Sequence, residues 1–388
     1  MLFEYFQTVP EKHQPDTLAE LEPLYRAVLH GCLAGEYKKA RKDVYWLRIL
    51  RGAKQYTLDE LGAYSQDLIA ISAFFPQGWS QPVSIGLTEN DQAWLLQAAS
   101  FCLMSLGRLA EAVVPRNACL VLHTKLKDFT ESANDAGSLT DLLLPLGKLY
   151  EAETAAQLAI NYALRSKDSC EQMINYSKLA TVLHRLGQFQ NAQQTFAQAE
   201  QLQQKRQPNY PYLYSAAGAW YCTLLVDTAR QPNDLDDILA RAEYGLKISQ
   251  HETWLKDMAL DHLTLARTYQ TQAQTDSARA AFADAILAIQ KSGMNMYMPE
   301  FYLARASFHL SQNELVKAKD DIDTANQTIT RCSMKLYAVD AALLLGRYYL
   351  AMNDKATAQS YYDQAAMLIA ETGYHLRNKD LTELKRAL

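Results

Sequence analysis

Alanine recurs along this chain at intervals close to 40 residues, and this repeat restricts the fold more than any other feature. Three similar segments, LGRLAEA, LGKLYEA and LGQFQNA, begin 40 residues apart at Leu106, Leu146 and Leu186. Extending the register gives one anchor position per repeat, occupied by Ala40, Ala112, Ala152, Ala192, Leu235, Ala278, Ala318 and Ala358. A period between about 20 and 50 residues is typical of arrays in which each unit packs on the next.

The residues around each anchor predict two helices per repeat. After Ala192, for example, apolar or small residues follow four and seven positions on, at Phe196 and Ala199. Before it, the small Ala180 is followed three residues later by the large Leu183. Spacings of three, four and seven lie on one face of a helix. The chain has only 15 Gly and 11 Pro in 388 residues, which also favours helices joined by short turns over a sheet-rich fold.

This order of small, large, alanine, bulky and alanine positions resembles the tetratricopeptide repeat. The resemblance implies an all-α solenoid, a right-handed superhelix of about eight helical hairpins. The usual unit of this repeat has about 34 residues, so about six further residues lengthen the helices or loops here. HEAT and armadillo repeats also have a period near 40, but they lack the paired small residues, and we rank them second.

Two regions interrupt the regular spacing. Residues 1–91 are expected to form N-terminal hairpins, with a helix at about 57–74 and an irregular loop near 76–90. Residues 92–388 are expected to form the repeat array, continuous with the N-terminal part. Thr88 and Asp91 have the spacing of a helix-starting cap. Further on, Pro208 and Pro211 are expected to end one helix and begin the next.

Composition and motifs argue against several classes of function. The formal net charge is −5 without a basic run, so nucleic acid is not an expected partner. Neither an apolar stretch long enough for a membrane nor a secretory leader is evident, and we expect a cytoplasmic protein. The six scattered cysteines are expected to be reduced core residues. No phosphate loop, nucleophile motif or metal-ligand spacing occurs, so we expect no enzyme activity, cofactor or metal. Acidic residues such as Asp320, Asp321 and Asp323 are expected on a solvated face.

The candidate binding surface is the inner face of the superhelix. In stacked hairpins the first helix of each pair lines this groove. The residues that face the groove lie one position after and six positions before the small residue of that helix. Arg267 and Arg347 are the leading candidates because they occupy equivalent places two hairpins apart. Arg, Tyr and acidic side chains suit the recognition of peptides or anionic ligands. The further candidates are His184, Arg185, Tyr212, Glu300 and Asp340.

An aromatic cluster lies next to Pro208 and Pro211. Tyr210, Tyr212, Tyr214, Trp220 and Tyr221 fall where the repeat spacing lengthens. Packing at this joint is the favoured interpretation, and a platform for a ligand is the alternative.

Several longer stretches resemble the C-terminal repeat region of bacterial STAND ATPases, which are signal-transduction ATPases of the NACHT/NB-ARC kind. The stretches are LEPLYRAVLHGCLAGEYKKARKDVYWLRILRG (21–52), QPNYPYLYSAAGAWYC (207–222), ALDHLTLAR (259–267) and ETGYHLRNKD (371–380). The resemblance implies the sensor half alone, because no nucleotide-binding module is present. LFEYF at the start resembles the helix that links the switch to the repeats, which favours a fragment of a longer protein.

These observations predict a non-catalytic sensor whose groove binds a protein, peptide or small effector. The resemblance implies a nucleotide-binding switch module as partner, in cis or in trans, and a role in signalling or bacterial defence. A free-standing scaffold that assembles other proteins is the main alternative. A hydrolase built on a helical solenoid is a further, less favoured one.

Overall fold

The computed structural model describes residues 1–388, and all of its regular structure is helical. The chain divides into two compact units, Met1–Asp128 and Phe129–Leu388, which we call unit 1 and unit 2. The boundary expected from the sequence, between residues 91 and 92, falls inside unit 1. None of the helices is both long and apolar enough to cross a membrane.

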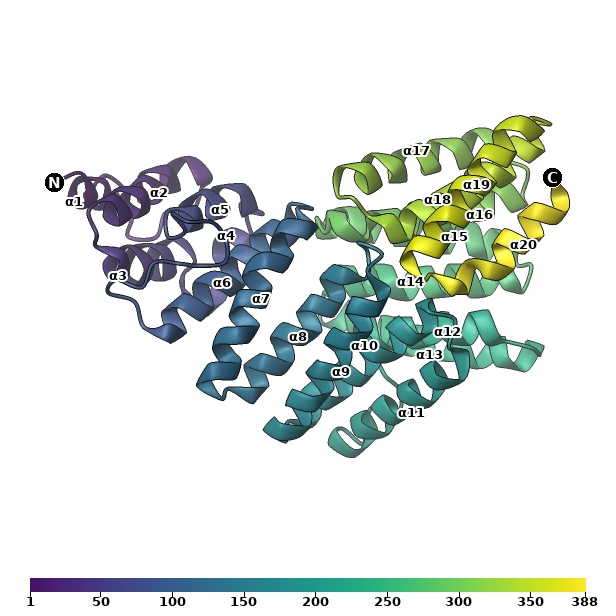
Figure 1. The fold of residues 1–388 in the computed structure, drawn as a ribbon, viewed down its shortest axis with the longest axis horizontal. Coiled ribbons are helices and arrows are strands. Elements are labelled where there is room, and N and C mark those ends of the chain that lie inside the picture. Colours follow the sequence, from purple (N-terminus) through teal and green to yellow (C-terminus); the bar gives the residue numbers. More distant parts are fainter. The chain divides into compact units, whose positions relative to one another are not determined.

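Unit 1 contains three long helices and several short or irregular ones (Figure 1). Its elements are α1 (Leu2–Thr8), α2 (Leu18–Leu33), α3 (Tyr37–Lys39), the π-helix η1 (Ala40–Ile49), the 3₁₀-helix η2 (Gly52–Lys54), α4 (Tyr56–Asp59), α5 (Tyr64–Ser72), α6 (Glu89–Ser105) and α7 (Leu109–Leu126).

Unit 2 consists of six consecutive helix pairs and a terminal helix (Figure 1). The pairs are α8 (Phe129–Leu143) with α9 (Leu149–Ser166), α10 (Ser169–Arg185) with α11 (Phe189–Arg206), α12 (Ser215–Thr228) with α13 (Pro232–His251), α14 (Leu255–Thr271) with α15 (Thr275–Ser292), α16 (Met298–Ser311) with α17 (Leu315–Arg331), and α18 (Lys335–Ala351) with α19 (Lys355–Thr372). The 3₁₀-helices η3 (Asn295–Tyr297) and η4 (His375–Arg377) and the helix α20 (Asn378–Ala387) complete it.

The anchor positions lie at the centre of the packing between helices. Each anchor falls in the second helix of a pair, and all seven alanines have no exposed surface, while Leu235 is 8% exposed. The small residues of the first helices, such as Ala180, Ala266 and Ala306, are also completely buried. Small side chains at these positions allow neighbouring helix backbones to approach closely, because little volume separates them. The helical-hairpin solenoid expected from the repeat is therefore confirmed.

The register of the first repeat differs from the prediction because its second helix is a π-helix. Val44, four residues after Ala40, is buried as expected, but Leu47 is 44% exposed. In η1 the Leu50 amide donates to the Tyr45 carbonyl, five residues back, at 2.9 Å. A π-turn is wider than an α-turn, so the buried face moves to Tyr45 and Ile49.

Two other local expectations are wrong in detail. The helix expected at about 57–74 is two helices, α4 and α5, because the chain turns at Gly62 with a φ of +60°. Pro211 does not begin a helix, since α12 starts four residues later at Ser215.

The cap at Thr88 is confirmed: its hydroxyl accepts from the Asp91 amide, and the Asp91 carboxylate accepts from the Thr88 amide. None of the six cysteines forms a disulfide bond, and five are buried.

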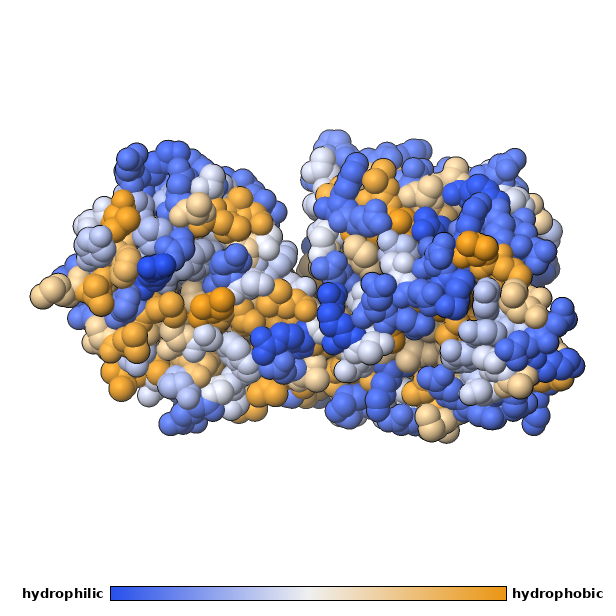
Figure 2. Space-filling model, turned by 90° about the horizontal axis from the view of Figure 1, so that it is seen from above, coloured by the Kyte–Doolittle hydropathy of each residue, from blue (hydrophilic) through white to orange (hydrophobic).

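The exteriors of the two units differ in polarity. Ten large apolar side chains are exposed in each unit, although unit 2 has about twice as many residues. In the face drawn in Figure 2, unit 2 is accordingly covered mainly by hydrophilic residues with small apolar areas between them. Exposed apolar side chains are therefore denser on unit 1 than on unit 2.

Candidate functional site

The inner surface of unit 2 is built by the first helix of each pair. Helices α8, α10, α12, α14, α16 and α18 contact one another in sequence, and the second helices pack behind them. The last pair then returns to the first two pairs. The Leu336 amide at the start of α18 donates to the Pro145 carbonyl in the α8–α9 turn, at 3.2 Å. Helix α10 also contacts η4, which follows α19. These return contacts enclose a channel along the first helices.

Glycines make the return contacts possible. Gly147 has a φ of +75°, and a Cβ placed on it would lie 2.6 Å from Thr372 Cγ2. Gly373 also has a φ of +75°, and its Cβ would lie 2.8 Å from the Tyr150 ring. Only glycine combines the left-handed backbone with so close an approach. The α8–α9 turn and the end of α19 are therefore shaped to fit one another.

The channel contains a cavity of about 180 Å³ with balanced charges. Four arginines and four acidic residues line it, together with Tyr337 and Tyr374 and several small or apolar side chains. The charged lining residues are Arg185, Asp227, Arg267, Glu300, Asp340, Arg347, Arg377 and Asp380.

Close ion pairs occupy the C-terminal side of this cavity. Arg377 Nε lies 2.5 Å from Asp340 Oδ1, and Arg347 Nη2 lies 2.6 Å from Asp380 Oδ1. These pairs connect α18 to η4 and α20, so their first role is to hold the terminal helices in place. Arg347 is accordingly less available to a ligand than its position in the repeat suggests.

The opposite side of the cavity holds a looser charge arrangement around Glu300. Arg185 Nη2 and Arg267 Nη2 lie 3.7 and 3.6 Å from Glu300 Oε1. Arg185 Nη1 is also 3.5 Å from the Tyr374 hydroxyl. These separations are longer than strong hydrogen bonds. The two guanidinium groups are therefore held near the Glu300 carboxylate, but neither makes a short hydrogen bond with it.

His184 stands in the wall beside this group rather than in the cavity. Its ring is 2% exposed, and Nε2 lies 3.0 Å from Asp227 Oδ2. Burial lowers the pKa of His184, although the hydrogen bond with Asp227 opposes this effect. The ring therefore lies behind the cavity, beside Asp227, which itself lines it.

The structure brings together five of the seven residues that the sequence analysis selected. Arg185, Arg267, Glu300, Asp340 and Arg347 line one cavity, and their role in binding stays a prediction. His184 is buried behind them. Tyr212 lies elsewhere, with its ring 5.7 Å from Tyr244 and under the Arg241 guanidinium.

Sequence reasoning missed the lining residues that come from the end of the chain. Tyr374, Arg377 and Asp380 follow the last anchor. Asp380 continues the 40-residue spacing of Glu300 and Asp340, so the repeat spacing could have found it. Arg377 and Asp380 join the site through ion pairs with α18, and Tyr374 joins it through its contact with Arg185 on α10. Asp321 is a further correction: it is 5% exposed and forms two hydrogen bonds with Arg305, so it does not lie on a solvated face.

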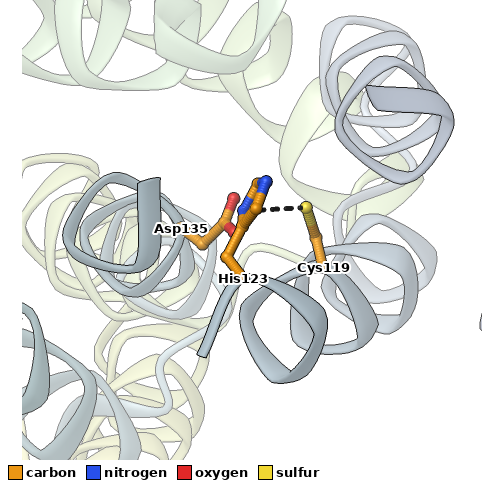
Figure 3. A group of neighbouring side chains, drawn as sticks. All are labelled: Cys119, His123 and Asp135. Atoms are coloured by element: carbon orange, nitrogen blue, oxygen red, sulfur yellow. Dashed lines mark hydrogen bonds between the residues drawn. The ribbon is translucent and has the colours of Figure 1, made fainter. Parts of the chain in front are cut away.

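A buried Cys–His pair in unit 1 also escaped the sequence analysis. Cys119 and His123 lie one turn apart on α7, with Sγ 3.6 Å from Nδ1 (Figure 3). Cys119 Sγ also lies 3.4 Å from the Ala93 carbonyl oxygen. Structural zinc sites use four ligands, and unit 1 supplies two here. We assign no metal to this pair.

A family model described as tetratricopeptide repeat matches residues 339–372, which cover most of α18 and α19. The chain therefore contains a tetratricopeptide-type domain. No curated protein matches the chain.

Solved structures with the same fold cover almost the whole chain. A Rap protein complexed with Competence and Sporulation Factor has a TM-score of 0.58 at 13% identity, covering 94% of this chain and 98% of its own. The Rap conjugation gene regulator of plasmid pLS20, in complex with the Phr* peptide, has a TM-score of 0.59 at 11% identity, covering 95% and 97%. Aspartyl phosphate phosphatase F from Bacillus subtilis has a TM-score of 0.55 at 13% identity, covering 90% and 92%. Identities this low establish a shared fold and not a shared function.

Proposed function

We propose that unit 2 is a non-catalytic recognition module that holds an extended peptide in its inner channel. The observation that carries this proposal is the arrangement of Arg185 and Arg267 on either side of Glu300, each more than 3.5 Å from its oxygen. A peptide segment offers carbonyl oxygens to the free guanidinium donors and N–H groups to the carboxylate. The balanced charge of the lining suits such a ligand better than it suits a polyanion.

Two of the similar structures support the proposal by analogy of fold. The plasmid pLS20 regulator was solved with the Phr* peptide, and another Rap protein with Competence and Sporulation Factor. The same arrangement of stacked hairpins thus accommodates a peptide in at least one protein. The analogy concerns the fold, and the groups that would bind are those of this chain.

The test is selection from a random hexapeptide library, followed by calorimetric titration of the selected peptides. We expect saturable binding by the full chain. Arg267→Ala removes one free donor group, and Ala304→Leu narrows the same cavity without changing its charge. Each variant is expected to weaken binding by about tenfold or more, since loss of a charge-assisted hydrogen bond costs about 1.5–3 kcal/mol.

The matched control removes two positive charges that lie outside the channel. Lys291 and Arg331 are exposed near the ends of the second helices α15 and α17. The double variant Lys291→Ala with Arg331→Ala is expected to bind selected peptides as the wild type does. Equal loss in the control and the channel variants, or no selected peptide at all, would contradict the proposal. Thermal melting of every variant checks that the fold is intact.

The resemblance of several stretches to STAND ATPases extends this proposal to a sensor that controls a nucleotide-binding switch. The measurement is ATP hydrolysis by a nucleotide-binding module encoded in the same reading frame or beside it, with and without this chain and a selected peptide. A peptide-dependent change in hydrolysis supports the sensor role. A scaffold would instead bind folded proteins stably and show no response to peptides.

A further inference from the structure

A second, larger cavity lies at the N-terminal ends of the inner helices, and we call it the apolar chamber. Its volume is about 350 Å³, and it is bounded by α10, the end of α11, the start of α12 and the residues that precede and begin α14. Met173, Leu213 and Trp220 provide apolar walls, while Trp254 at the edge is 42% exposed. The chamber has room for one large apolar side chain.

The chamber and the charged cavity both adjoin a third cavity. A narrow cavity of about 50 Å³ lies between them. It shares Trp220 and Tyr297 with the chamber, and it shares Arg185 and Glu300 with the charged cavity. The three cavities therefore follow one another along the inner face, with the chamber at one end.

Cations at the chamber exceed acids. Lys178, Arg206 and Lys256 line it, against the single acid Asp141. Lys178 Nζ is 2.8 Å from Asp141 Oδ2, so these two neutralise each other. Arg206 hydrogen-bonds the neutral side chain of Gln207, and Lys256 lies 3.5 Å from Asp257 at the edge. The chamber thus combines apolar walls with cationic groups that suit a carboxylate.

A buried amide in the wall adds a third chemical requirement. Gln203 has no exposed surface, and its Nε2 donates to Gln207 Oε1 at 2.7 Å. Its own oxygen, Oε1, has no hydrogen-bond partner. An unpaired buried acceptor is unfavourable, and an N–H group on a bound ligand would satisfy it.

From these features we infer that the apolar chamber binds the C-terminal residue of a peptide. This inference rests on the proposed function. It adds which end of the peptide lies in the chamber and in which direction the peptide runs. The apolar side chain of the last residue occupies the space beside Trp220 and Met173. Its carboxylate lies toward Arg206 and Lys256, and its amide N–H faces Gln203. The preceding residues continue through the narrow cavity toward Arg185 and Glu300.

The experiment compares hexapeptides that end in Phe, Leu, Ser or Lys, each prepared as the free acid and as the C-terminal amide. Binding is measured by titration calorimetry with the full chain. We expect the Phe and Leu acids to bind about tenfold or more tighter than their amides and than the Ser and Lys acids. Arg206→Gln with Lys256→Gln should abolish the preference for the acid. Ala217→Leu, which fills part of the chamber, should abolish the preference for Phe.

The control variant neutralises two exposed lysines that do not line the chamber. Lys205→Gln with Lys247→Gln removes the same charge from α11 and α13 and should leave both preferences unchanged. Peptides that bind without preference for a C-terminal apolar acid would overturn this inference and leave the proposed function standing. Failure of every peptide to bind would overturn both. Octanoate competing as well as the Phe acid would overturn the assignment to a peptide end.

Discussion

The Asp261 carboxylate on α14 accepts a hydrogen bond from the Ser249 hydroxyl on α13, at 2.9 Å, in the interior of unit 2. Gly245 allows this approach, because a Cβ on it would lie 2.7 Å from Asp261 Oδ1. Burial raises the pKa of Asp261 to about 8; the Ser249 hydrogen bond opposes the rise and nearby Asp257 adds to it. The folded protein therefore retains a proton on Asp261 that the unfolded chain releases above pH 4.

This retained proton gives a pH dependence of stability with a defined sign. Between about pH 4 and pH 8 the folded state binds more protons than the unfolded state, so this group lowers stability as pH rises. Asp261→Asn removes the effect and should stabilise the protein at pH 8 by an amount on the order of a few kcal/mol. Urea unfolding at pH 5, 7 and 8.5 measures it. The exposed Asp237→Asn serves as control, and an equal gain in that variant would contradict the explanation.

Enlarging an anchor alanine should destabilise unit 2. Ala318 has no exposed surface, so Ala318→Leu must displace the facing helix or adopt a strained rotamer. Overpacking of this kind costs about 1–3 kcal/mol. Ala356→Leu, on the exposed surface of α19, should be nearly neutral in the same thermal and urea unfolding measurements. Comparable losses at both positions would show that helix packing is not the cause.

Substitution of Gly147 should weaken the return contact at the end of the chain. Gly147→Ala incurs the left-handed backbone cost of about 1 kcal/mol and also displaces Thr372. Gly293→Ala incurs only the backbone cost, since no atom lies within 4 Å of the position of its Cβ. Hydrogen exchange of residues 372–377 should therefore accelerate in Gly147→Ala and not in Gly293→Ala. Equal protection in both variants would contradict the role of this contact.

Arg48 should be important for the stability of unit 1. Its Nε donates to the His13 carbonyl at 2.9 Å, and its Nη1 donates to the Gln7 carbonyl at 2.8 Å. Arg48→Met keeps the length of the side chain but loses both bonds, which should cost about 2–3 kcal/mol. Arg48→Lys should recover only part of this loss, because an ammonium lacks the forked donors. Hydrogen exchange of residues 7–14 reports the effect, and exposed Lys42→Met is the control.

The repeat allowed the architecture of unit 2 to be predicted because its cause is local. A small residue is needed wherever two helices touch, and the need recurs with each pair, as at Ala192 and Ala278. Leu47 was placed incorrectly because the sequence gives no sign that η1 is a π-helix. Asp321 was assigned to solvent because its partner, Arg305, lies on the preceding helix, where its direction depends on packing.

The site could be predicted only as far as the repeat extends. Arg267 and Arg347 follow from equivalent positions, and the structure places both in one cavity. Arg185 and Tyr374, by contrast, are 189 residues apart and meet through the return of the last pair to α10. No periodic pattern encodes that closure, because it depends on the small rotation between successive pairs, accumulated over the whole unit.

The contact between Leu336 and Pro145 has a consequence for how fast a ligand exchanges. This contact closes the side of the channel. The proposed peptide must therefore enter lengthwise or wait until the first and last helix pairs separate. The rates of binding and release would then be set by the opening of the protein. A peptide of modest affinity would still have a long residence time while this contact stays closed.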